Sequence, residues 1–207
     1  EFGTIAAHIG EFRVEITTYR ADSYDGTSRK PEVVFGDTLE ADLFRRDFTM
    51  NAMALTLPEV KLVDPCEGLT DLLAGVLKTP NAPEESFHDD PLRMMRAARF
   101  VSQLGATVDP ATLAAMRDMS ARILDISAER VRDELLRMVS SDSPREGLEI
   151  LVDTGLAEHV LPELPALRLE SDEHAHHKDV YEHTLTVVDQ AISEEKRRNP
   201  GAPPDVT

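Results

Sequence analysis

The pattern of apolar residues changes near residue 90, and this change constrains the fold more than any other feature of the chain. Before it, β-branched residues alternate with polar ones, and prolines and glycines interrupt every long element between residues 56 and 90. Beyond Pro91, apolar residues from Leu92 to Leu104 recur at helical spacing, and Gly105 follows as a natural C-cap. The sequence therefore predicts an α+β fold, with a mixed or antiparallel sheet and helices in front and an all-helical part behind.

The front part is expected to contain short elements. Gly10 in the turn and β-branched residues in the second arm predict a β-hairpin of Thr4–Ile9 and Arg13–Tyr19, on which Glu15 projects away from the apolar side. Apolar spacing favours one helix over Leu39–Leu55, which should pack against a sheet. Shorter pieces are expected as strands at 33–35, 62–65 and 76–79 and as a helical turn at 70–74.

Behind residue 90, helix starts and stops are easier to locate. Asp109 is a natural N-cap with Pro110 at the first helical position, and Gly155 is a natural stop. The expected helices cover 92–104, 110–119, 130–139, 144–154 and 179–197. We expect three domains, at residues 1–90, 91–165 and 166–207.

Composition excludes several classes of protein. The single cysteine, Cys66, excludes an internal disulfide framework and any zinc site built on two or more cysteines, so a reducing cytoplasm is the simplest location. No apolar run approaches the roughly 20 residues that span a bilayer. We therefore expect a cytoplasmic protein without a membrane segment.

The net charge of −17 argues against a general nucleic-acid coat, because polyanions bind through Lys and Arg. Residues 91–139 are an exception, since they carry eight arginines and six acidic side chains. Arginine suits bidentate contacts to phosphate or base edges. The alternative is that these arginines pair with carboxylates on solvated helix faces.

Two clusters of polar residues point to nucleotide handling. In the first, Asp47 and Asn51 stand four residues apart, so on a helix both can face one ligand, with Arg46 at the same end. The alternative is that Asp47 only caps a helix start. In the second, Asp90 lies beside Arg93 and Arg96, and a carboxylate next to a guanidinium can match the Watson–Crick edge of a base. The alternative here is a salt-bridged helix start.

These clusters resemble motifs of a known family. Together with Val14–Arg20 and the run from Asp64-Pro65 through Gly68 to Asp71-Leu72, they resemble the class II tRNA nucleotidyltransferases and bacterial poly(A) polymerases. The resemblance runs from Gly3 to about Gly155. Within the family, the Asn51–Ala54 segment is more similar to a CCA-adding enzyme than to a poly(A) polymerase.

The resemblance implies roles for individual residues. Glu15 matches a carboxylate beside an Asp-x-Asp pair that holds two Mg²⁺ ions. Arg46, Asp47 and Asn51 match the motif that grips the ribose and phosphates of the incoming nucleotide. Asp90 and Arg93, with Arg96 nearby, match the amino-acid template that selects C or A. The Glu129-Arg130 pair with Glu134 resembles a helix motif that supports the template, although an ordinary amphipathic surface explains it equally well.

The chain also departs from the family pattern. Asp89 stands where Glu is usual, and Cys66-Glu67 replaces the usual Phe-Gly, which puts hinge behaviour there in doubt. The Gly-Ser turn and the Asp-x-Asp pair do not occur ahead of Glu15, and Glu15 alone cannot hold two ions. We therefore expect a fragment without the start of the head domain, inactive by itself.

A histidine cluster near the other end resembles the opening of an HD-type metal phosphohydrolase domain, which would be truncated here. It comprises His174, His176, His177 and His183. His183 would be the first metal ligand, and the alternative is an exposed, metal-free cluster.

Taken together, the sequence predicts a fragment of a template-independent RNA nucleotidyltransferase. In its full-length form it would add C and A to tRNA 3′ ends, with CTP and ATP as substrates and Mg²⁺ as cofactor. No protein partner can be inferred. The alternatives are a poly(A) polymerase of the same family, a non-catalytic nucleotide- or RNA-binding module, and an HD-type metal phosphohydrolase.

Overall fold

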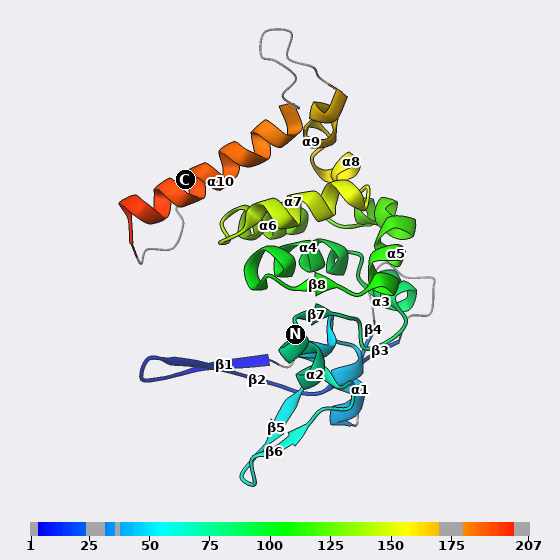
Figure 1. Ribbon diagram of the computed structural model, residues 1–207. Helices are drawn as coiled ribbons and strands as arrows, with labels where there is room; N and C mark the ends of the chain where they lie inside the picture. The colour runs from blue at the N-terminus through cyan, green and yellow to red at the C-terminus, as the bar shows by residue number, and fades with distance from the viewer. Residues whose placement is uncertain (1–3, 24–31, 36–37, 170–179, 201–207) are drawn as a thin grey trace.

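A computed structural model describes residues 4–23, 32–35, 38–169 and 180–200. It confirms an α+β fold, in which short strands and helices in the front part precede a stack of longer helices (Figure 1). The strands of the described residues form four two-stranded sheets, of which three are antiparallel and one is parallel. None of the described helices is long and apolar enough to cross a membrane.

The predicted hairpin is confirmed, with β1 at Thr4–Ile9 and β2 at Phe12–Thr17. It extends away from the rest of the molecule (Figure 1), and Ile16 on β2 is 61% exposed. The predicted strand at 33–35 is confirmed as β4 (Glu32–Phe35), which pairs with β3 (Arg20–Ser23). Strand β3 was not predicted from the sequence, because its segment reads as polar.

The long helix expected over 39–55 is wrong. Helix α1 covers only Leu39–Phe44, and a 3₁₀ turn, η1, follows at Thr49–Asn51. In a continuous helix the Arg45 carbonyl would accept the amide of Thr49. Instead Arg93 donates to that carbonyl at 2.5 Å, and the Thr49 amide donates to the Lys78 carbonyl at 2.8 Å. Bonds to distant segments therefore override the helical periodicity.

Strands β5 (Ala54–Thr56) and β6 (Lys61–Val63) pair next, and α2 (Gly68–Ala74) follows. Asp64 caps α2, because its carboxylate accepts the amides of Gly68 and Leu69 at 2.7 and 2.9 Å. Strand β7 (Val76–Leu77) then pairs in parallel with β8 (Thr107–Val108), which links the front part to the helical part.

The region 56–90 also contains a helix that the sequence analysis missed. Helix α3 covers Pro83–Asp89, with Pro83 at its first position. A proline there starts a helix rather than breaking one, because the first amides of a helix have no partner to lose. Helix α3 ends directly beside the Asp90–Arg93 cluster.

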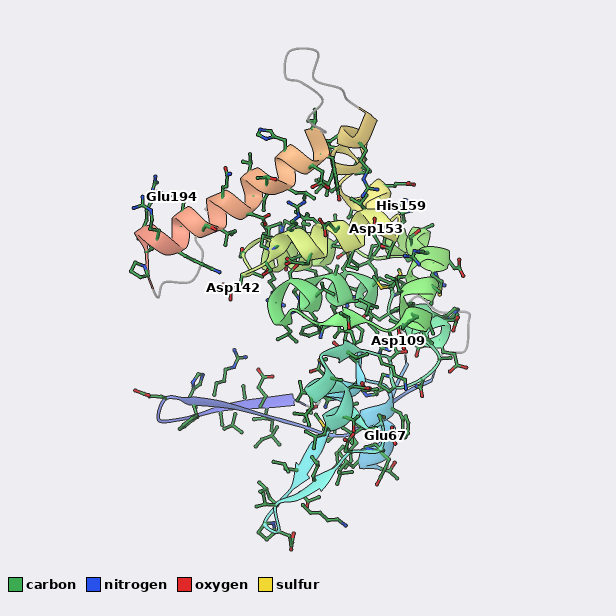
Figure 2. The ribbon with its side chains drawn as sticks, viewed as in Figure 1. Glu67, Asp109, Asp142, Asp153, His159 and Glu194 are labelled. Carbon is green, nitrogen blue, oxygen red and sulfur yellow. The ribbon has the colours of Figure 1, made fainter. Side chains whose placement is uncertain are left out.

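Four helices follow it in the chain, and their predicted positions are confirmed: α4 (Leu92–Leu104), α5 (Pro110–Met119), α6 (Ala128–Val139) and α7 (Pro144–Asp153). Asp109, labelled in Figure 2 directly before α5, caps this helix through the amides of Ala111 and Thr112. Helix α4 packs against α6 and α7, and the core includes Met94, Met138 and Leu151.

The remaining described elements are short until the last helix. They are η2 (Ser120–Asp125), α8 (Ala157–Val160), α9 (Glu163–Ala166) and η3 (Leu167–Leu169), followed by α10 (Val180–Arg198). Helix α10 buries Tyr181 and Leu185, and Arg145 on α7 contacts Glu182 and Asp189 on it. The expected helix at 179–197 is thus present, one residue shifted at each end.

Candidate nucleotide-binding site

A pocket of about 420 Å³ lies between the 45–51 loop, the start of α4 and helix α6. It brings together all six residues that the sequence analysis named as nucleotide-binding. Its lining consists of Arg46, Asp47, Asn51, Asp90, Arg93 and Arg96, together with Leu92 and Arg130. Residues from two motifs about 40 positions apart therefore share one site, although their role in binding a nucleotide stays a prediction.

The 45–51 loop presents its polar side chains from a turn rather than from a helix. The Asp47 carboxylate accepts the Phe48 amide at 2.9 Å and the Asn51 side-chain amide at 3.1 Å. Asp47 and Asn51 thus contact each other across a turn, whereas their spacing predicted that both would face one ligand from a helix. Arg46, on the same loop, is half exposed and pairs with Asp42 at 3.1 Å. Phe48 is fully buried and anchors the loop in the core.

Thr49 holds the loop from behind, against α2. Its hydroxyl donates to the Asp71 carboxylate at 2.6 Å, and Thr49 itself is 2% exposed. Gly68 lies so close that an added Cβ would be 2.0 Å from the Thr49 carbonyl oxygen. Glycine is therefore required at this position for α2 to approach the loop.

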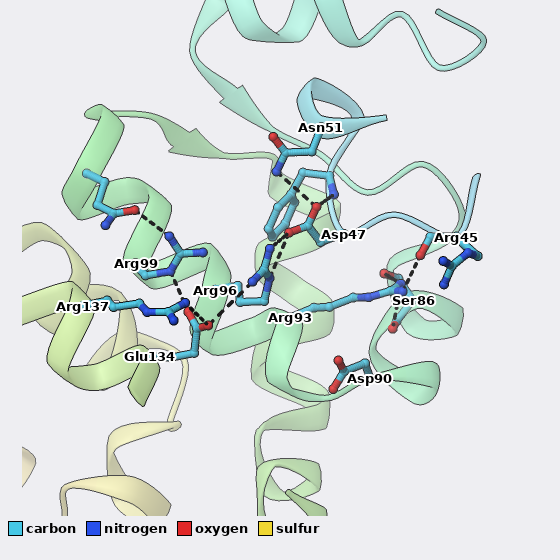
Figure 3. Close-up of polar contacts among 12 residues, drawn as sticks. Arg45, Asp47, Asn51, Ser86, Asp90, Arg93, Arg96, Arg99, Glu134 and Arg137 are labelled. Carbon is cyan, nitrogen blue, oxygen red and sulfur yellow. Dashed lines mark hydrogen bonds and ion pairs between the residues drawn. The ribbon is translucent and has the colours of Figure 1, made fainter. Parts of the chain in front are cut away.

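Arg96 joins the loop to α4. Its guanidinium donates to the Asp47 carboxylate through Nε at 2.9 Å and also through Nη2 (Figure 3). Burial alone would raise the pKa of Asp47, but the charge of Arg96 and the hydrogen bonds from Arg96, Asn51 and Phe48 outweigh it and hold the pKa below its ordinary value. Asp47 is therefore a carboxylate at neutral pH.

Asp90 and Arg93 lie at the N-terminal end of α4, and each forms hydrogen bonds with other residues. One Asp90 carboxylate oxygen accepts the Leu92 amide at 3.2 Å, and the other accepts Arg130 of α6 at 2.9 Å. Arg93 donates to the Ser86 hydroxyl at 2.8 Å and to the Arg45 carbonyl at 2.5 Å. Asp90 and Arg93 thus bond to other residues, and both line the same pocket. Their role in reading a base stays a prediction.

A buried carboxylate supports the arginines from α6. Glu134 is 4% exposed and accepts Arg99 Nε at 2.6 Å, with Arg96 at 3.6 Å and Arg137 at 3.7 Å (Figure 3). Arg99 also donates to Gln103 at 2.6 Å and lies over the Phe100 ring. The alternative of an ordinary amphipathic surface is therefore wrong for Glu134, whereas Glu129 is exposed.

The pocket is positively charged although the chain is acidic. Four arginines line it, Arg46, Arg93, Arg96 and Arg130, against only two carboxylates, Asp47 and Asp90. The arginines offer planar sets of donors that match phosphate oxygens and base edges. The arrangement can therefore bind an anion and read a planar polar group beside it.

The two other predicted site residues lie elsewhere. Glu15 on β2 has a side chain that is 55% exposed and pairs with Arg13 at 2.7 Å. His183 is exposed on α10, whereas His174, His176 and His177 lie outside the described residues. Within the described ranges, no three His, Cys, Asp or Glu side chains converge to hold a metal ion.

Comparison with known proteins decides the family. The family described as "Poly A polymerase head domain" matches residues 1–78, and the one described as "Probable RNA and SrmB-binding site of polymerase A" matches residues 105–167. A CCA-adding enzyme of Lactobacillus johnsonii is 40% identical over 159 residues, which are 76% of this chain and 40% of the relative. The CCA-adding enzyme of Levilactobacillus brevis is 41% identical over 157 residues, 75% of this chain and 39% of the relative.

The chain belongs to the poly(A) polymerase and CCA-adding enzyme family. Solved structures of this family share its fold. The Bacillus stearothermophilus CCA-adding enzyme in complex with CTP is 35% identical, with a TM-score of 0.66 over 74% of this chain and 37% of that chain. A tRNA nucleotidyltransferase complexed with a primer tRNA and an incoming ATP analog is 26% identical, with a TM-score of 0.65 over 90% of this chain and 57% of that chain. The chain spans about 40% of the length of the two CCA-adding enzymes from Lactobacillus johnsonii and Levilactobacillus brevis.

Proposed function

We propose that this chain is part of a template-independent nucleotidyltransferase that adds C and A to the 3′ end of tRNA, with CTP and ATP as substrates. The observation that carries the proposal is the positively charged pocket lined by both polar motifs. Its relatives are CCA-adding enzymes, and one similar structure was solved in complex with CTP.

In the proposed reaction, the 3′ hydroxyl of the tRNA attacks the α-phosphate of the nucleotide, forms the new phosphodiester bond and loses its proton, while pyrophosphate leaves. Different residues of the pocket bind different parts of the nucleotide. Arg46 faces the pocket at the 45–51 loop and contacts the phosphates, whose charge its guanidinium complements. Asp47, ionised and fixed by Arg96, and Asn51 hold the ribose hydroxyls.

Base selection falls to Asp90 and Arg93. C and A both present an exocyclic amino group as a donor beside a ring-nitrogen acceptor on their Watson–Crick edges. A carboxylate oxygen of Asp90 accepts from the amino group, and a free N–H of Arg93 donates to the ring nitrogen. U and G present a carbonyl where C and A have the amino group, so they leave the carboxylate facing an acceptor and are disfavoured.

Mg²⁺ is the cofactor that the resemblance implies, and it would supply electrostatic stabilisation of the transferred phosphoryl group. Glu15 is the described residue assigned to it, and its carboxylate pairs with Arg13. No group of three His, Cys, Asp or Glu side chains that could hold a metal ion occurs among the described residues. The described residues therefore do not by themselves fit a two-metal site.

The binding part of the proposal is tested with the 207-residue chain itself. Dissociation constants for CTP, ATP, UTP and GTP are measured by titration calorimetry, and CTP and ATP should bind more tightly than UTP and GTP. Arg93→Ala should reduce this preference about tenfold, the effect of losing about 1.4 kcal/mol from one ligand hydrogen bond. Unchanged preference in Arg93→Ala would reject the base-reading role.

Poly(A) polymerase is the second candidate, favoured by the match of residues 1–78 to a poly(A) polymerase head domain. An enzyme that contains this chain is given a tRNA lacking its terminal CCA, together with labelled CTP or ATP. Incorporation of both nucleotides supports CCA addition. Incorporation of A alone would replace it with poly(A) addition.

A further inference from the structure

Ser86 is a buried serine on α3 that contacts both residues of the proposed base-reading pair. It is 2% exposed and lies one helical turn before Asp90. Its carbonyl accepts the Asp90 amide at 3.2 Å, which is the bond that ends α3. Its hydroxyl accepts Arg93 Nη1 at 2.8 Å, and the same nitrogen lies 3.4 Å from its carbonyl. One residue thus links the backbone of Asp90 to the side chain of Arg93.

These contacts fix the guanidinium of Arg93 in one orientation. Ser86 holds Nη1 from one side, and the Arg45 carbonyl holds Nη2 at 2.5 Å from the other (Figure 3). An arginine side chain carries five N–H groups in a planar fork, so fixing two of its nitrogens fixes the direction of the remaining N–H groups. Without the Ser86 hydroxyl, one end of the fork would keep only the longer contact to the Ser86 carbonyl.

We infer that Ser86 is a positioning residue for base specificity, which acts by holding Arg93 in register with Asp90. This inference rests on the proposed function of the pocket. Recognition by a donor and an acceptor together requires a fixed distance between them, and a mobile arginine loses discrimination more than it loses general attraction for an anion. Ser86 should therefore affect selectivity between bases more than binding of the triphosphate.

The test compares Ser86→Ala with wild type in the same calorimetric titrations of the 207-residue chain. Affinity for CTP and ATP should fall about five- to tenfold, the size expected for losing one ordinary hydrogen bond, while affinity for UTP and GTP should change less than about twofold. Ser86→Thr keeps a hydroxyl and should restore the preference. A merely structural role would lower all four affinities together.

Ser102→Ala is the matched control. Ser102 lies on α4, is 1% exposed, and its hydroxyl has no hydrogen-bond partner within the described part of the chain. This variant should leave all four affinities unchanged. Melting curves followed by circular dichroism identify variants that do not fold. If Ser86→Ala does not fold, Ser86→Cys is measured in its place, because cysteine has a similar volume and its sulfur is a much weaker hydrogen-bond acceptor.

The possible outcomes separate this inference from the proposed function. If Arg93→Ala reduces the preference for CTP and ATP while Ser86→Ala does not, Ser86 has no positioning role and the proposed function stands. If wild type shows no preference and Arg93→Ala changes nothing, the proposed function fails and the inference fails with it. If both variants reduce the preference and Ser86→Thr restores it, the inference is supported.

Discussion

Replacement of Glu134 by Gln tests whether the arginines beside the pocket depend on one buried carboxylate. Glu134 accepts Arg99 at 2.6 Å and lies within 3.7 Å of Arg96 and Arg137. Glutamine keeps the size of the side chain and removes its charge. Arg99, only 8% exposed, would then retain Gln103 and the Phe100 ring as its neighbours but lose its paired carboxylate.

The expected loss is large because the charge left behind is buried. Removal of one partner from a buried ion pair typically costs about 3–5 kcal/mol, since the other ion keeps its desolvation penalty without compensation. The retained contacts of Arg99 and the remaining oxygen of Gln place the estimate at the lower end, about 3 kcal/mol. For a chain of this size, this corresponds to a fall in the melting temperature of about 6–12 °C.

Asp133→Asn on the same helix is the control. Asp133 pairs with Arg132 at 2.8 Å, but both side chains are more than half exposed, so the loss of this pair should cost less than about 0.5 kcal/mol. Unfolding in urea is followed by circular dichroism, because the chain has no tryptophan. If Glu134→Gln lowered the free energy of unfolding no more than Asp133→Asn does, the reasoning about the buried carboxylate would be refuted.

Two other predictions concern the 45–51 loop. The pKa of Asp47 is lowered in the folded protein. Its ion pair with Arg96 therefore stabilises the fold fully at pH values above the ordinary carboxyl pKa of 3.8. This stabilisation is lost as the pH falls through the lowered pKa. Asp47→Asn should therefore reduce the free energy of unfolding at pH 7. In acid titrations, the difference in this free energy between the variant and wild type should shrink below about pH 4. A difference in free energy that did not change with pH would contradict this reasoning. Gly68→Ala should cost about 2 kcal/mol or more in urea unfolding and weaken CTP binding, because its methyl group would overlap the Thr49 carbonyl. Equal stability and affinity in Gly68→Ala would show that α2 does not hold the loop.

The helical part was predictable because its signals are local. Asp109 with Pro110 marks a helix start, and Gly105 and Gly155 with positive φ mark two helix ends, so the boundaries follow from neighbouring residues alone. The six pocket residues were also named from the sequence, since two short motifs carry them. Their grouping in one pocket depends on long-range contacts that spacing does not encode.

The features that could not be predicted from the sequence depend on partners far along the chain. The apolar spacing of 39–55 fits a helix, but Arg93 and Lys78 take the hydrogen bonds that would continue it past residue 45. Ser86 has no signal of its own, because a single serine in a short segment after a proline reads as a connector. Its contacts become visible only once α3 and α4 are placed side by side.

The acidic charge of the chain and the basic charge of the pocket act over different distances. At an ionic strength of about 0.15 M, interactions are screened beyond about 8 Å, so a bound triphosphate interacts mainly with the four arginines of the pocket. At about 0.01 M the screening length is about 30 Å, and the acidic flanks on either side of residues 91–139, in a chain whose net charge is −17, repel the same ligand. Lowering the salt strengthens both effects, and they oppose each other. The affinity for CTP should therefore depend less on salt concentration than the charge of the pocket alone predicts. A steep rise in CTP affinity at low salt would show that the acidic flanks lie too far from the pocket to repel the ligand.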